Sequence, residues 1–195
     1  MVMVTLTASN GAQFFAFYAQ VILGKIFVGG ETSISISLVM NLMLVSEALA
    51  QFTSMLLVRK VSRRTLLITY GISLACLNTL LVLLDIWNLN TLAVVIILLM
   101  VFSSECLGVP VQTIYTIEVM NNSALGFIQL YSNIVFMLVS FFVAQMVHFF
   151  SVPVLFSICA GLCLVQALFV AFFVKETSGL TDKEKKSLYA SKHID

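Results

Sequence analysis

Long runs of apolar residues follow one another along the chain, separated by short polar segments. A helix that crosses the hydrocarbon core of a bilayer needs about 20 mostly apolar residues. The pattern therefore predicts six membrane-spanning helices, at approximately 11–28, 38–58, 65–84, 92–117, 127–149 and 152–174. The first is the weakest of these, because Gln13, Gln20 and Lys25 interrupt it.

The composition supports a membrane protein over a soluble one. Of the 195 residues, 61% are hydrophobic and 10% are charged, whereas soluble domains carry roughly 25% charged residues. We expect an all-α membrane protein with one transmembrane domain over residues 1–195, in which 175–195 form a tail. The net charge of +1 gives no reason to expect nucleic acid as a partner; the expected surroundings are a lipid bilayer.

The basic residues show which side of the membrane the loops occupy. If all six stretches cross the bilayer, nine of the ten lysines and arginines fall on one side, and only Lys25 is left over. The densest group is the segment "RKVSRR" at 59–64. Because basic loops remain in the cytoplasm, we expect a multi-pass protein, in the plasma membrane, with both termini and the tail in the cytoplasm.

Several polar residues interrupt the apolar spans. Glu47, Gln51 and Ser54 repeat at helical spacing, and Glu105 lies within the fourth span. A charged group at the bilayer centre costs about 2.5–3.5 kcal/mol, so such residues are expected to face a bundle interior or an aqueous cavity. Hydrogen bonding between helices is the alternative explanation. The third and sixth spans contain no charged residue, which indicates that they shield the cavity from lipid.

Other features bear on the fold and on chemistry. Pro110, two residues after Gly108, is expected to kink the fourth span. The cysteines are interpreted as small buried hydrophobic residues; they are Cys76, Cys106, Cys159 and Cys163. The sequence offers no pairing of nucleophile and base and no metal-ligand spacing, so neither enzymatic activity nor a cofactor is expected.

Four segments resemble the sugar porters of the major facilitator superfamily. "RKVSRR" resembles the pattern R-x-G-R-R of a cytoplasmic loop, and "SNGAQFFAFYAQ" (9–20) resembles that of the seventh helix. "GVPVQTIYTIEV" (108–119) is similar to the tenth-helix pattern G-P-I-P-W-x-x-x-x-E, and "VKETSGLTDKE" (174–184) to P-E-T-K-G-x-S-x-x-E. Within this family, the four segments most resemble the facilitated trehalose transporters of insects. The resemblance implies the C-terminal half of a two-half fold, in which the seventh and tenth helices line a central cavity and the ninth and twelfth face lipid.

The chain departs from these family patterns at several positions. Thr7 and Ala8 stand where the family has glutamines, and Gln13 where it has asparagine. Arg59 stands where the family often has an acidic residue. The remaining differences are Ser62, Gln112, Thr113, Leu125 and Lys175. The positions that contact sugar are therefore more altered than the cytoplasmic charges.

The resemblance implies transport of a hexose or a disaccharide such as trehalose by alternating access. The expected substrate contacts are Gln13, Tyr18, Gln20, Glu105, Gln112, Gln129 and Asn133. The expected cytoplasmic charge network, which would hold the inward gate closed, consists of Arg63, Arg64, Glu118 and Glu176. A cavity between two halves also implies a missing N-terminal half or a partner chain.

Alternatives remain open at this point. The chain could be a degenerate half-transporter that binds or regulates a full-length porter without transporting anything. A third hypothesis is proton-coupled transport through Glu105 or Glu47, although proton-linked relatives usually hold that carboxylate in the N-terminal half. The segment 59–64 could also serve only to fix the topology.

Overall fold

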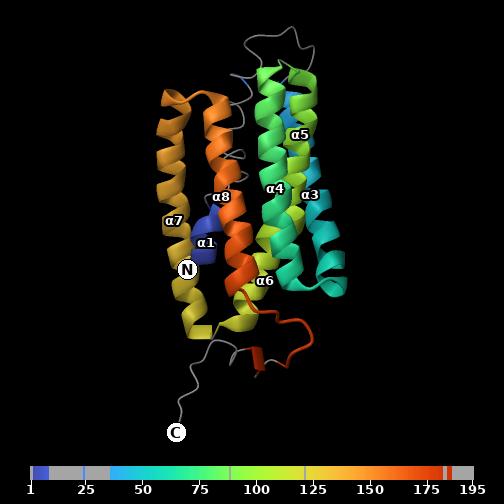
Figure 1. Cartoon of the computed structure of the whole chain (residues 1–195). Coiled ribbons are helices and arrows are strands. Elements are labelled where there is room, and N and C mark those ends of the chain that lie inside the picture. Colours follow the sequence, from blue (N-terminus) through green and yellow to red (C-terminus); the bar gives the residue numbers. More distant parts are fainter. Residues whose placement is uncertain are drawn as a thin grey trace.

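The computed structural model describes residues 2–8, 24, 36–87, 89–120, 122–181 and 184–185. The described segments form helices and contain no strand, which confirms the all-α class (Figure 1). The helices are α1 (Val2–Ala8), α3 (Ile36–Lys60), α4 (Arg63–Ile86), α5 (Asn90–Ser103), the π-helix η1 (Ser104–Gly108), α6 (Val109–Val119), α7 (Asn122–Phe149) and α8 (Val152–Phe173).

Five helical stretches are long and apolar enough to cross a membrane. They are Ile36–Lys60, Arg63–Ile86, Thr91–Val119, Ala124–Val143 and Val152–Phe173, and they match the second to sixth expected spans. The first expected span, 11–28, lies outside the described residues apart from Gly24, so a sixth crossing stays a prediction. The structure also shows that a helix begins at Val2, well ahead of the expected start of that span.

The fourth span is not a continuous α-helix. Its middle is the π-helix η1, in which the N–H of Val109 donates to the carbonyl of Ser104, five residues earlier. Pro110 follows immediately, in the first turn of α6. A proline ring clashes with the carbonyl four residues before it, and a wider turn at that place relieves the clash. The irregularity expected from Pro110 is thus present, but it lies in the preceding turn.

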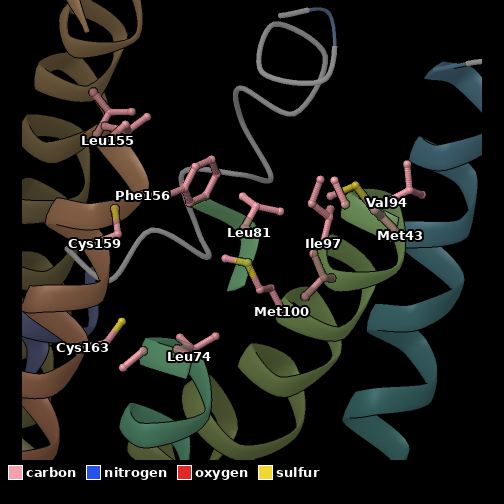
Figure 2. Packing of buried hydrophobic residues seen from close by; sticks show 14 of the residues in the cluster. Met43, Leu74, Leu81, Val94, Ile97, Met100, Leu155, Phe156, Cys159 and Cys163 are labelled. Atoms are coloured by element: carbon pink, nitrogen blue, oxygen red, sulfur yellow. The ribbon is translucent and has the colours of Figure 1, made fainter. Parts of the chain in front are cut away.

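Helices α4 and α8 pack against each other more extensively than any other pair among the described elements. Gly71 permits this close approach, because a Cβ added there would lie 2.9 Å from the Cβ of Ala167. Figure 2 shows Leu74 and Leu81 of α4 beside Phe156 and the two cysteines of α8. A much larger share of α4 and α8 than of α3 and α7 is buried within the chain. The fourth span is the most buried of the five, so α4, α8 and the fourth span together form the packed centre of the described chain.

The interpretation of the cysteines is correct for three of the four. Cys106, Cys159 and Cys163 are buried, whereas Cys76 is exposed, and all are free thiols. Cys76 lies on the side of α4 that faces away from the core. The prediction that it is a buried hydrophobic residue is therefore wrong.

Candidate functional site

A tight connection places two arginines at the start of α4. Helix α3 ends at Lys60, and α4 begins at Arg63 after two residues. The Ser62 hydroxyl caps α4 by accepting a hydrogen bond from the Thr65 N–H at 3.2 Å. Cations at a helix N-terminus oppose the helix dipole, so Arg63 and Arg64 need acidic partners from elsewhere in the fold.

Glu118, in the last turn of α6, supplies the first of these partners. Its Oε1 atom lies 3.1 Å from the guanidinium of Arg63 and 3.2 Å from the ammonium of Lys185. Its Oε2 atom accepts a hydrogen bond from the Thr177 hydroxyl at 2.7 Å. One carboxylate therefore joins the start of α4, the end of α6 and the tail.

Glu176, just after α8, is the second acidic residue at this end of the bundle, and it contacts the backbone of Arg64. Its Oε2 accepts the backbone N–H of Arg64 at 3.3 Å, and the guanidinium of Arg64 donates to the carbonyl of Ala171 in α8. Burial alone would raise the pKa of Glu176. Hydrogen bonds to its charged form outweigh burial and hold the pKa below its usual value; their donors are the Ser62 hydroxyl and the backbone N–H groups of Ser178, Arg64 and Thr177.

The tail therefore crosses the ends of α4 and α6 (Figure 1). A further contact fixes it, because the Tyr115 hydroxyl of α6 donates to the carbonyl of Lys175 at 3.0 Å. Of the predicted charges, Arg63 and Glu118 form an ion pair, whereas Glu176 contacts Arg64 through the backbone N–H of Arg64 and not through its guanidinium. Sequence reasoning missed Thr177, Lys185 and Tyr115, because nothing in their spacing pairs them with residues about 60 positions away.

A pocket of about 380 Å³ opens between α6 and α7. Gln112 and Gln129, two of the expected substrate contacts, both line it. The Oε1 of Gln112 is buried and has no hydrogen-bond partner among the described residues. The Nε2 of Gln129 lies 3.5 Å from Oδ1 of the exposed Asn133, one turn along α7. The other lining residues are Thr113, Thr116, Ile117, Leu125, Gly126, Ile128 and Ser132, of which the three hydroxyl residues were not predicted.

Glu105 lies apart from this pocket. It belongs to η1, and its Oε2 accepts a 3.4 Å hydrogen bond from Gln51 of α3. Glu105 and Gln112 are seven residues apart, a spacing that would place both side chains on one face of a regular α-helix. The π-turn between them inserts one extra residue, which rotates the following face by about 100°. This rotation explains why the two side chains have different neighbours.

The other predicted substrate contacts, Gln13, Tyr18 and Gln20, lie outside the described residues. Their places relative to the pocket stay a prediction. Within the described part of the chain, no group of three or more histidine, cysteine or acidic residues is arranged to hold a metal ion.

Long apolar helices with a charged network at one end define a multi-pass membrane protein. The family model described as "Sugar (and other) transporter" matches residues 1–189, and the chain therefore belongs to that family. The family consists of transporters rather than enzymes, and belonging to it supports a lipid bilayer and a sugar as partners of this chain. A comparison with curated proteins finds no match.

Proposed function

We propose that this chain is the C-terminal six-helix half of a facilitator that moves a hexose or a disaccharide such as trehalose by alternating access. The observation that carries the proposal is the set of contacts at Glu118, which ties α4, α6 and the tail together. These are the positions at which the family resemblance implies a cytoplasmic gate. Basic residues that served only to fix the membrane topology would need no ion pairs or hydrogen bonds to other segments of the chain.

The gate works through the free energy of several weak contacts. An exposed ion pair contributes only about 0–1 kcal/mol, and a hydrogen bond to a charged group about 1.5–3 kcal/mol. Glu118 has three such partners, and Glu176 bonds to backbone groups in addition. Together these contacts stabilise the closed cytoplasmic end, and they must separate before a solute can leave on that side.

The pocket between α6 and α7 is proposed to hold the sugar. Its volume falls in the range of roughly 300–1,000 Å³ that small-molecule sites occupy. Gln112 and Gln129 are uncharged and can both donate and accept hydrogen bonds, as sugar hydroxyls require. Asn133 extends this polar surface along α7, and Gln13, Tyr18, Gln20 and Glu105 are proposed to complete it.

One wall of the proposed cavity must come from another unit. Gln129 and Asn133 are exposed, and α3 and α7 bury little of their surface within this chain. We propose that an N-terminal half or a partner chain covers these faces. We further propose that the protein resides in the plasma membrane with both termini in the cytoplasm. The match along residues 1–189 does not favour the alternative of a non-transporting regulator.

Uptake into reconstituted vesicles tests the proposal. Vesicles containing the chain together with the N-terminal half of a sugar porter are expected to take up labelled glucose or trehalose saturably. Gln112→Ala should reduce uptake, whereas Ser157→Ala, on an exposed site of α8, should not. Absence of uptake for every hexose and disaccharide, with both halves folded and associated, would refute the proposal. Uptake by the chain alone would refute the need for a second half.

A further inference from the structure

An apolar groove of about 570 Å³ runs between α3, α4 and the α5–η1 segment. It lies away from the pocket between α6 and α7 and shares no lining residue with it. The residues that line it are Thr53, Leu57, Ile72, Ser73, Cys76, Leu77, Leu99, Phe102, Ser103, Cys106 and Leu107. All of them belong to helices that are long and apolar enough to cross a membrane, so in a bilayer this groove would face hydrocarbon.

The packing of three helices explains the groove. Helices α3 and α4 both pack on α5 and η1 but make little contact with each other, although they are consecutive in the chain. The gap between them is not filled, because small side chains line it at Ser73, Cys76 and Ser103. Ile72, Cys76 and Leu99 are exposed along it. The groove therefore results from the way α3 and α4 pack on α5 and η1.

The groove leads toward two basic residues that have no role in the gate. Thr53, Leu57 and Lys60 follow i, i+4, i+7 spacing, which places them on one face of α3. Lys60 therefore lies about one turn beyond the groove, at the membrane surface. Arg59 and Lys60 are exposed, and neither forms an ion pair within the part of the chain that the structure describes.

The contrast with the next two arginines is clear. Arg63 binds Glu118, and Arg64 binds the carbonyl of Ala171. An unpaired cation pair at the membrane surface attracts negatively charged lipid headgroups.

We infer that this groove binds one acyl chain of an anionic phospholipid whose headgroup phosphate lies on Arg59 and Lys60. The apolar wall fits a hydrocarbon chain, and the basic pair at its end fits the phosphate, to which an arginine fork can donate two hydrogen bonds. A zwitterionic lipid gains less at this site, because its headgroup carries no net negative charge to attract the basic pair. The inference depends on the helices crossing the bilayer but not on the transport of a sugar.

Native mass spectrometry of the full chain in detergent, titrated with phosphatidylserine or phosphatidylcholine, tests the role of charge. Phosphatidylserine is expected to bind more tightly. Each basic residue at a membrane surface is worth about a fivefold change in affinity, so Arg59→Gln with Lys60→Gln should weaken phosphatidylserine binding about thirtyfold. Lys175→Gln, which removes an exposed cation elsewhere, is the matched control and should change binding less than twofold.

A second pair of variants tests the role of the groove. Cys76→Phe fills it and should lower phosphatidylserine binding at least fivefold, whereas Ser157→Phe adds the same ring at an exposed site of α8 outside it. The unmodified chain gives an independent measurement that needs no folded variant. Because Cys76 is the exposed thiol, bound phosphatidylserine should slow its alkylation by a maleimide, and phosphatidylcholine should slow it less.

Either of two outcomes would overturn the inference. Equal binding of both lipids, unchanged in the Arg59/Lys60 double variant, would show that the basic pair recognises no headgroup. Loss of binding in that double variant, with no effect of Cys76→Phe and no protection of Cys76, would show attraction to the surface without an acyl chain in the groove.

Discussion

The ring of Tyr70 lies where a side chain on Gly108 would begin. Tyr70 is fully buried in α4, and a Cβ added to Gly108 would overlap three carbon atoms of its ring. Gly108 is also the last residue of η1, where the chain passes from the π-turn into α6. The bare backbone at this glycine therefore lets α4 approach the irregular part of the fourth span.

Gly108→Ala is expected to destabilise the protein by about 1–3 kcal/mol, because a rigid buried ring cannot move aside without strain. Thermal unfolding in detergent measures the loss. Gly126→Ala is the matched control, since a Cβ there meets nothing within 4 Å and alanine favours the helix by about 1 kcal/mol. Equal melting temperatures for the two variants would contradict the proposed role of the Tyr70 contact.

Glu118→Gln should loosen the cytoplasmic end of the bundle. The amide keeps an acceptor for Thr177 but loses the charge that binds Arg63 and Lys185, at a cost of about 1–3 kcal/mol. Faster hydrogen exchange of the backbone amides at 174–181 is the expected result. Glu184→Gln, a change at an exposed acid of the same tail, should leave the exchange of 174–178 unchanged; an equal increase in both variants would show that tail charge alone matters.

The contact of Glu176 with α4 should depend on pH. The folded-state pKa of Glu176 lies below its usual value of 4.5. Its stabilising contribution is therefore complete above about pH 4.5 and is lost as the pH falls through the folded-state pKa. Hydrogen exchange of the tail amides, corrected for intrinsic rates, should rise in that acidic range. In Glu176→Gln, the tail amides should already exchange fast at pH 7 and should show no further increase on acidification. An acid-induced increase that remains in this variant would show that another group causes it.

Gln112→Ala should weaken sugar binding without unfolding the protein. One uncharged hydrogen bond is worth about 0.5–1.5 kcal/mol, which corresponds to a rise in KM of about two- to tenfold. Thr79→Ala is the control, because Thr79 lies on the exposed side of α4, where its hydroxyl donates to the carbonyl of Ala75. A KM that is unchanged in Gln112→Ala would remove the α6–α7 pocket as the sugar site.

The sequence predicted the fold class and five of the spans well, because hydrophobic length alone decides them. The family resemblance also selected Arg63, Glu118 and Glu176, whose contacts join segments far apart in the chain. Periodicity failed at Glu105, since an α-helical count cannot foresee a π-turn. It also could not find Lys185 or Thr177, whose contacts depend on how the tail folds back across α6.

Helices α3 and α4 show a second feature that hydrophobic periodicity cannot predict. Their apolar patterns predicted both helices, but the groove between them depends on how each packs on α5 and η1. The same limit applies to Cys76, whose exposure follows from the side of α4 that it occupies. Side-chain type did not distinguish it from the three buried cysteines.

The central claim is that the tail and the end of α6 separate in each transport cycle. A reversible bifunctional thiol reagent joining Glu118→Cys to Thr177→Cys, on a Cys76→Ser background, tests this claim in transporting vesicles, because these side chains are in contact. Cross-linking is expected to stop sugar uptake, and a reductant should restore it. Uptake that continues at an unchanged rate while the cross-link is complete would contradict the account.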